Sequence, residues 1–311
     1  MLTEQDQELR KGKITSTRIA MIAGLSKYGG PIDAYQEILG IGPEKETTAD
    51  MQRGHYLEDA CLHWYRDQYG VAITPGKTSI HPQFECFAAT PDGIAENGSN
   101  KIVIEAKSPR EASHWGEANT DDIPDYHVCQ VAWEMACLDM SKAHVVAYVN
   151  HEFRCYKIER DKDLENQLIE IAHTFWQKHI QSKTPPEADA SKSYADFLAR
   201  TFAKHSDNLI AADNEATAWA MEYFKNRKQR ETFEEREEKA KNHLKKLIGD
   251  NYGMRGDGFT IVWREVKGQK SIAWQEIANK LGVTQDMIHE HTCLGKAHRR
   301  FNATLLAELV P

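Results

Sequence analysis

Several segments of the chain place apolar residues at the three- and four-residue intervals of an amphipathic helix. In residues 15–23 a hydroxyl-rich start precedes such apolar positions, which predicts a helix beginning near Thr17, a candidate N-cap. The same spacing predicts helices over 51–68, where Gly70 ends the pattern, and over 126–138. Helices are therefore expected on both sides of a central segment of different character.

That central segment has the short, β-branched pattern of strands. F-E-C-F-A-A-T runs into the turn P-D-G, and K-I-V-I-E-A-K follows the turn N-G-S-N, so residues 84–107 are predicted to form a β-hairpin. Two further strands, 144–149 and 153–158, are predicted around Asn150-His151. The order of helix, hairpin, helix, strands and helix indicates a mixed α/β core of the α+β type.

A change of composition divides the chain near residue 190. Residues 181–192 hold the prolines and small polar residues of a linker, so we predict one domain over 1–190 and an appendage over 191–311. The appendage is expected to be mainly helical, with a long charged helix over 215–247 and a short strand over 259–266.

The composition excludes several classes of protein. The 311 residues include 41% hydrophobic and 28% charged residues, and the net charge of −8 argues against a uniformly basic, nucleic-acid-coating surface. Any contact with DNA should be local. No apolar run is long enough to span a membrane and no secretory signal is apparent, which predicts a cytoplasmic protein. The six cysteines form no C-x-x-C motif and are expected to be free thiols.

The predicted hairpin places three polar residues where they can form a catalytic site. Asp92 follows the first strand, and Glu105 and Lys107 lie two residues apart on the next, so their side chains should share one face. Two carboxylates there, with the backbone carbonyl of Ala106, can bind Mg²⁺ through oxygen ligands. Breaking a phosphodiester at neutral pH requires an activated water, which a divalent ion supplies, and Lys107 could orient or deprotonate it.

This spacing alone also fits a set of surface salt bridges. The context favours the catalytic interpretation, because P-D-G ends a strand, an apolar strand precedes E-A-K, a helix carrying Glu58 lies upstream and a helix carrying Gln130 lies downstream. For Glu58 the alternative is a solvated helix carboxylate, and for Gln130 it is an ordinary surface glutamine. Both alternatives remain open at this point.

With these elements in order, residues 12–180 resemble the phage lambda exonuclease and YqaJ-type recombinase nucleases of the PD-(D/E)XK superfamily. The matching segments are I-T-S-T-R-I-A-M-I-A-G-L-S, R-G-H-Y-L-E, A-A-T-P-D-G, V-I-E-A-K-S-P and Y-H-V-C-Q-V-A-W-E-M. The resemblance implies a restriction-endonuclease-like core with a mixed central sheet flanked by helices. It also implies roles for single residues: Asp92 and Glu105 as metal ligands, Glu58 as an outer metal-site acid, Lys107 as catalytic lysine and Gln130 as a site-orienting amide.

The T-S-T-R segment lies near the 5′ phosphate in such enzymes, so the resemblance makes Thr17 and Arg18 candidates for binding it, with Ser108 as a weaker one. For Thr17 the alternative is a purely structural N-cap. Some superfamily members bind an iron–sulfur cluster through one cysteine before the helical acid and three late ones. Here Cys61 follows Glu58 and no late triple exists, so no cluster is expected.

The resemblance implies a Mg²⁺-dependent 5′→3′ exonuclease acting on ends of linear double-stranded DNA, with Mn²⁺ expected to substitute. It would leave 3′ overhangs for a single-strand annealing partner in phage-type recombination inside a bacterial host, and several similar enzymes are ring-shaped trimers. The alternatives are a restriction- or repair-type endonuclease of the same fold and a catalytically silent DNA-end-binding scaffold. The intact Asp92, Glu105 and Lys107 disfavour the scaffold.

The appendage carries two weaker patterns. Residues 225–246 hold nine Lys/Arg against five Glu, which is typical of a solvated helical arm with pairs four residues apart. Residues 273–288 have the spacing of a helix-turn-helix around Gly282, although small helix pairs without DNA-binding function share it.

Overall fold

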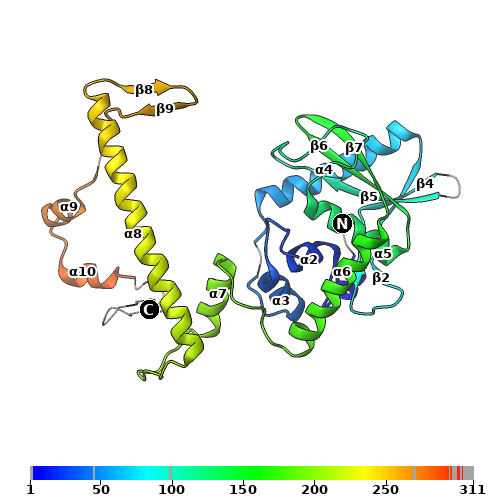
Figure 1. Cartoon of the computed structure of the whole chain (residues 1–311), viewed down its shortest axis with the longest axis horizontal. Helices are drawn as coiled ribbons and strands as arrows, with labels where there is room; N and C mark the ends of the chain where they lie inside the picture. Colours follow the sequence, from blue (N-terminus) through cyan, green and yellow to red (C-terminus); the bar gives the residue numbers. More distant parts are fainter. Residues whose placement is uncertain are drawn as a thin grey trace. The chain divides into compact units, whose positions relative to one another are not determined.

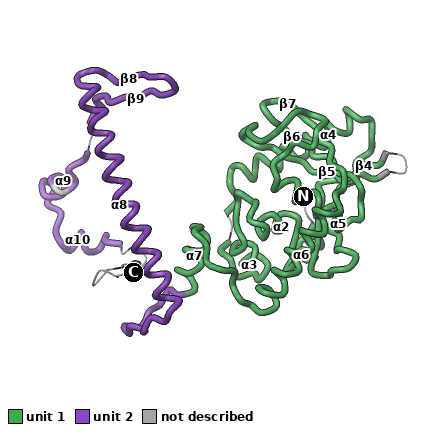
Figure 2. Tube along the Cα trace, viewed as in Figure 1, with its two compact units in different colours: residues 1–201 green, residues 202–311 purple. Residues whose placement is uncertain are grey.

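The structure, a computed structural model, describes residues 3–44, 46–97, 100–268, 271–293, 295, 300–301 and 303. The chain forms two compact units, Met1–Thr201 and Phe202–Pro311 (Figure 2). No helix among the described residues is long and apolar enough to cross a membrane.

The first unit carries the predicted α/β core, with helices before, within and after a central sheet (Figure 1). Its elements are α1 (Glu4–Arg10), α2 (Ser16–Ile22), α3 (Pro31–Leu39), α4 (Ala49–Tyr69), β1 (Ala72–Pro75), β2 (Ser79–Ile80), β3 (Ala88–Ala89), β4 (Gly93–Asn97), β5 (Asn100–Lys107), α5 (Asp125–Leu138), β6 (Lys142–Val149), β7 (Glu152–Glu159), α6 (Lys162–Phe175), the π-helix η1 (Trp176–Gln181) and α7 (Lys192–Thr201).

The central sheet has five strands in the order β1-β4-β5-β6-β7. Strands β4 and β5 form an antiparallel hairpin, and β5 pairs with β6 in parallel, so the sheet is mixed. A parallel pair needs a crossover connection, and helix α5 lies in the segment between β5 and β6. The predicted mixed sheet flanked by helices is confirmed, and β5, which carries the E-x-K motif, is its middle strand.

Side chains of β5 alternate between the two faces of the sheet. Val103 packs in a cluster with residues of α5, whereas Ile102 and Ile104 pack with Cys61 and Tyr65 of α4. The two helices thus cover opposite faces (Figure 1). Odd-numbered residues of β5 face α5, and this parity fixes the side on which Glu105 and Lys107 lie.

Local sequence signals set the ends of α4. Thr48 accepts a hydrogen bond from the backbone N–H of Met51, as an N-cap does, and Gly70 ends the helix with a φ of 64° that favours glycine. The helices predicted over 51–68 and 126–138 are both present. Helix α2 begins at Ser16 with Thr15 as its N-cap, so Thr17 lies inside the first turn and is not the N-cap.

The predicted hairpin over 84–107 is correct only for its second half. Ala88 and Ala89 pair with β2 rather than with β5, and Phe87 bridges to Ile14. Pro91 separates this short strand from β4, because proline offers no N–H to a ladder. Asp92 therefore precedes the first strand of the hairpin instead of ending a strand.

The division between the units follows residue 201, whereas the composition had placed it after residue 190. Tyr194 and Phe197 of α7 are buried in the core cluster that α2, α3, α5 and α6 also build. The Tyr194 hydroxyl donates to the carbonyl of Pro186 over 2.9 Å. Helix α7 thus packs with the first unit. The linker-like composition of the residues before it had indicated a boundary there instead.

The second unit is built on one long helix. Its elements are α8 (Asn214–Ile248), β8 (Gly253–Gly256), β9 (Phe259–Val262), α9 (Trp274–Lys280) and α10 (Gln285–Glu290). Strand β9 ends four residues earlier than predicted. Among the described residues of α8, Ile248 is the buried side chain, so most of the helix is exposed, as expected for a solvated arm.

Candidate active site

The β4–β5 hairpin brings Asp92 beside the E-x-K motif. Asp92 Oδ2 accepts a hydrogen bond of 2.7 Å from the backbone N–H of Ala106, which fixes the carboxylate next to the middle of β5. Lys107 Nζ donates to Glu105 Oε1 over 2.5 Å, so these two side chains lie on the same face of the strand. The three groups that the sequence singled out are therefore close together in space.

Helix α5 completes the site from the side of the sheet that Glu105 faces. Gln130 Nε2 donates to Glu105 Oε1 over 2.5 Å and to Glu134 Oε1 over 3.2 Å. Glu105 is 3% exposed and Glu134 is fully buried. The amide of Gln130 thus bridges two buried carboxylates, which fits the orienting role proposed for it.

Glu58 and Ser108 lie on the α4 side of this site. The Glu58 carboxylate is half-buried, and its ion pair is with His55 at 4.0 Å rather than with a residue of the hairpin. Arg53 of the same helix donates to the backbone carbonyl of Ser108 over 2.7 Å. That bond joins the segment after β5 to α4 through the carbonyl of Ser108.

Burial and neighbouring charges shift the pKa values of the ionisable groups at this site. Burial, together with the charge of Glu105, raises the pKa of Asp92 and of Glu134 well above the usual carboxyl values. Burial also raises the pKa of Glu58. Burial alone would lower the pKa of Lys107, but the carboxylates of Glu105 and Asp92 outweigh it and raise that pKa, so the lysine is a cation here.

This arrangement suits a hard divalent cation. Glu105 Oε2 and Glu134 Oε2 are buried without a hydrogen-bond partner among the described residues, and a buried carboxyl oxygen of this kind needs a proton, a donor or a cation. No three His, Cys, Asp or Glu side chains in the described part of the chain converge into a complete metal cage. Mg²⁺ keeps several waters and is commonly held by one or two carboxylates plus substrate phosphate, so Asp92, Glu105 and the Ala106 carbonyl are a fitting donor set.

Thr17 and Arg18, which were predicted to bind a phosphate, have different surroundings in the structure. Thr17 is exposed, with its hydroxyl 3.3 Å from that of Thr15. Arg18 is engaged elsewhere: its Nε donates to Glu37 Oε2 over 3.1 Å, and its Nη1 donates to the carbonyls of Arg10 and Lys13. These bonds give Arg18 a structural task at the start of α2.

Two residues that sequence reasoning did not assign lie close to these groups. Glu134 lies four residues after Gln130, the spacing that places two side chains on one helix face. The guanidinium of Arg10 makes no hydrogen bond or ion pair that the described residues provide, and it lies close enough to Glu105 and Glu134 to be influenced by their charge. Burial and the nearby charge of Arg18 lower the pKa of Arg10, because both disfavour its charged form.

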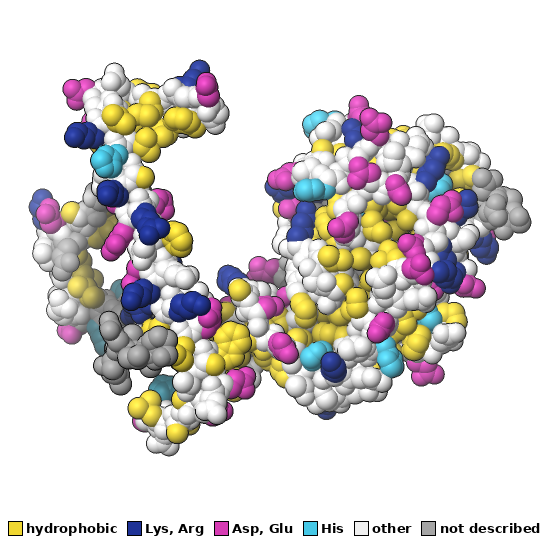
Figure 3. Space-filling model, viewed as in Figure 1, with side chains coloured by type: hydrophobic (Ala, Val, Ile, Leu, Met, Phe, Trp, Pro, Cys, Tyr) yellow, Lys and Arg dark blue, Asp and Glu magenta, His cyan; other side chains and the backbone are white. Residues whose placement is uncertain are grey.

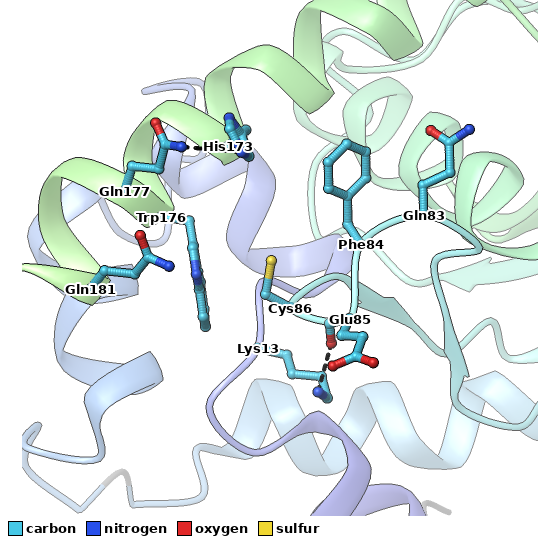
Figure 4. Close-up of a pocket in the computed structure, with 9 residues that line it drawn as sticks. All are labelled: Lys13, Gln83, Phe84, Glu85, Cys86, His173, Trp176, Gln177 and Gln181. Carbon is cyan, nitrogen blue, oxygen red and sulfur yellow. Dashed lines mark hydrogen bonds between the residues drawn. The ribbon is translucent and has the colours of Figure 1, made fainter.

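A separate pocket of about 460 Å³ opens between the loop that precedes β3 and the helix formed by α6 and η1 (Figure 4). Phe84 and Trp176 line it, and Lys13 donates from its ammonium to the carbonyl of Glu85 over 2.7 Å. None of the residues that line this pocket belongs to the candidate catalytic set. The pocket is therefore a feature separate from the candidate site.

Comparison with known proteins supports the family resemblance. Residues 7–141 match the family model of the YqaJ-like viral recombinase domain. This range contains Asp92, Glu105, Lys107 and Gln130, so the resemblance inferred from the motifs is confirmed where the site lies. No curated protein matches the chain.

Several solved structures are similar to part of the chain. LHK-Exo in complex with dAMP is 24% identical, with a TM-score of 0.49 over 58% of this chain and 94% of its own. The same alkaline exonuclease from Laribacter hongkongensis, in a second structure, has a TM-score of 0.48 at 24% identity over the same shares of the two chains. A phage-related exonuclease from Haemophilus somnus 129PT is 15% identical, with a TM-score of 0.40 over 55% of this chain and 96% of its own.

Proposed function

We propose that this protein is a metal-dependent deoxyribonuclease, and more specifically a Mg²⁺-dependent exonuclease that degrades linear double-stranded DNA from its 5′ ends. The observation that carries the proposal is the convergence of Asp92, Glu105 and Lys107 on the β4–β5 hairpin, above the buried Gln130 and Glu134. This set lies within the range that matches the YqaJ-like viral recombinase domain.

Asp92, Glu105 and the Ala106 carbonyl would hold the ion, with Glu58 as an outer carboxylate. A divalent ion in such a site lowers the pKa of water and offsets negative charge on phosphate oxygens. Gln130 keeps the Glu105 carboxylate in place, because its amide has both Glu105 and Glu134 as acceptors. A preorganised carboxylate loses less freedom when it binds a cation.

Lys107 contributes a fixed positive charge beside the carboxylates. Its ammonium has three donors, and Glu105 takes one of them over 2.5 Å. The remaining donors are available to a phosphodiester oxygen or to the attacking water, where negative charge develops during hydrolysis. The lysine thus orients the water and stabilises the transition state.

Arg10 and Thr17 supply the preference for a 5′ end. The guanidinium of Arg10 has no hydrogen bond or ion pair with the described residues and lies within electrostatic range of Glu105 and Glu134, and Thr17 is exposed. A guanidinium and a hydroxyl are good ligands for a terminal phosphate. Arg18 remains a second candidate, although its Nε and Nη1 already donate to Glu37 and to two backbone carbonyls.

The product would be a duplex with 3′ single-stranded overhangs, which suits recombination by single-strand annealing. A separate annealing protein would receive the overhang, and a ring-shaped trimer would keep the enzyme on its substrate. Both follow from the resemblance to the lambda exonuclease and YqaJ-type enzymes.

The test uses linear duplexes labelled at either end, beside a covalently closed circle. The protein should degrade from 5′ ends when Mg²⁺ or Mn²⁺ is present, stop when EDTA removes the ion, and leave the circle intact. Degradation from 3′ ends would overturn the polarity. Cutting of the circle would assign an endonuclease, and inertness toward every substrate with retained end binding would assign a scaffold.

A further inference from the structure

The β8–β9 hairpin of the second unit carries one continuous apolar face. Gly253 pairs with Val262 and Met254 with Ile261, and Trp263 continues the register by donating its N–H to the carbonyl of Tyr252 over 3.0 Å. Cross-strand partners share a face and successive residues alternate. One face is therefore built from Tyr252, Met254, Phe259, Ile261 and Trp263.

Three aromatic side chains of this face are open to solvent. Tyr252 is 63% exposed, Phe259 51% and Trp263 50%. The Phe259 ring lies over Gly256, where a Cβ would come within 2.4 Å of it, so the glycine makes room for the ring. Figure 3 shows hydrophobic side chains gathered along this hairpin. A two-stranded ribbon is marginal by itself, so a face of this kind indicates a ligand.

The charges around the hairpin identify the chemical class of that ligand. Residues 239–267 hold seven Lys/Arg and three Asp/Glu, a local net charge of +4 in a chain whose net charge is −8. Arg264 lines a pocket of about 500 Å³ together with Tyr252 and Trp263. Aromatic rings beside a cation, on a surface of the opposite sign to the rest of the protein, suit a polyanion that carries flat rings.

We infer that the apolar face of the β8–β9 hairpin binds single-stranded DNA, with bases stacked on Tyr252, Trp263 and Phe259 and the backbone held by the surrounding Lys and Arg. Tyr252 lies opposite Trp263 across the two strands, and Phe259 lies four residues before Trp263, roughly 13 Å along an extended chain, so a strand of a few nucleotides can reach all three rings. The inference rests on the proposed function, because the 3′ overhang is the strand that this function leaves.

A second copy of the chain is the main competing occupant. Two such faces packed together would bury the same rings, but they would also bring two surfaces of net charge +4 against each other. DNA instead complements the charge.

Binding of 5′-fluorescein-labelled dT20 to the full chain is measured by anisotropy in EDTA, so that catalysis plays no part. Trp263→Ala and Tyr252→Ala should each weaken binding on the order of tenfold, whereas Trp263→Phe should keep most of the affinity because it keeps a ring. Arg264→Gln should reduce the slope of log affinity against log salt by about 0.7, the share of one phosphate contact on a single strand.

Val262→Ala and Thr260→Ala are the matched controls, because these side chains lie on the opposite face of the same strand. They should leave dT20 binding unchanged. Equal affinity in all variants would overturn the inference, as would light scattering in which Trp263→Ala only reduces the oligomeric state. A loss confined to duplex DNA would assign the face to double strands instead. A protein without nuclease activity could still bind dT20 in this way, so the two proposals fail separately.

Discussion

Gln130 of α5 donates from Nε2 to Glu105 Oε1 of β5 over 2.5 Å, and this bond joins the helix that covers the sheet to the strand at its centre. The same amide nitrogen donates to Glu134, so one neutral side chain holds two buried carboxylates that would otherwise repel each other. The candidate site therefore depends on the packing of α5 as much as on the E-x-K motif.

Gln130→Ala should lower the apparent affinity of the site for Mg²⁺ while the protein stays folded. Without the amide, Glu105 loses its orientation and lies near Glu134 without a bridging donor, so the Mg²⁺ concentration that gives half-maximal nuclease activity should rise about 10- to 100-fold. The measurement is a Mg²⁺ titration of DNA degradation. Gln177→Ala, an exposed glutamine at the separate pocket, is the control and should leave the titration unchanged.

Lys107→Ala should lower the rate of DNA hydrolysis about 10²- to 10⁴-fold, because it removes the cation that positions the attacking water. Lys101→Ala on the same strand is the matched control, since Lys101 is exposed and pairs with Glu96 at the far end of the hairpin. Release of labelled nucleotides from a linear duplex measures both. Comparable activity in the two variants would remove Lys107 from the mechanism.

Arg10→Gln and Arg18→Gln should have different effects. Arg10→Gln should reduce the preference for a 5′-phosphorylated duplex over a 5′-hydroxyl one on the order of tenfold, the loss of one charge-assisted contact. Arg18→Gln should instead lower the free energy of unfolding by about 1–3 kcal/mol, because Glu37 and two carbonyls lose their donor. The converse pattern would restore Arg18 as the phosphate ligand.

Acid should destabilise the first unit through His144. Burial lowers the pKa of His144 to about 4, and Tyr65 Oη lies 2.7 Å from its Nδ1. Above the ordinary pKa of about 6.5 the ring is neutral in both the folded and unfolded states. Between that value and about 4 the unfolded chain takes up a proton that the folded protein excludes, so the free energy of unfolding falls as the pH falls.

The check is urea denaturation of the protein and of His144→Asn at about pH 7 and about pH 5. Asparagine keeps a polar group for Tyr65 but does not titrate. The native protein should therefore lose about 1 kcal/mol more than the variant over this range, after allowance for partial solvent screening. Equal losses would mean that His144 is not the responsible group.

The boundary between the units leads to a prediction about truncation. A chain ending after residue 201 should keep the stability of the first unit, whereas one ending after residue 190 should lose on the order of 4 kcal/mol. The shorter chain lacks Phe197, whose ring lies 6.4 Å from that of Tyr35, and the buried Tyr194. Thermal unfolding of both fragments measures the difference, and equal melting temperatures would place the boundary at residue 190.

Periodicity predicted the helices well because capping residues and apolar spacing are local properties. Thr48 and Gly70 mark the ends of α4 within the sequence itself. The pairing of Ala88 and Ala89 with β2 could not be predicted in this way, because it depends on a partner strand some ten residues earlier and on the bridge from Phe87 to Ile14. Strand partners are a property of the whole fold.

The same distinction between local sequence properties and tertiary contacts applies to the candidate site. The parity of a strand was sufficient to place Glu105 and Lys107 on one face. The different contacts of Arg10 and Arg18 could not be predicted, because Glu37, which accepts from Arg18, lies on a different helix. Which partners a cation has depends on tertiary contacts that a motif does not contain.

The position of β5 in the middle of the sheet has a consequence for how the site behaves over time. Residues 100–104 of β5 pair with β4 on one side, residues 103–107 pair with β6 on the other, and the Asp92 carboxylate accepts from the N–H of Ala106 where β4 no longer pairs. Amide hydrogens of the doubly paired residues should therefore exchange with solvent only when the whole unit opens, whereas exchange at Ala106 depends on a single side chain. The Asp92 carboxylate thus protects the end of the strand that carries the E-x-K motif.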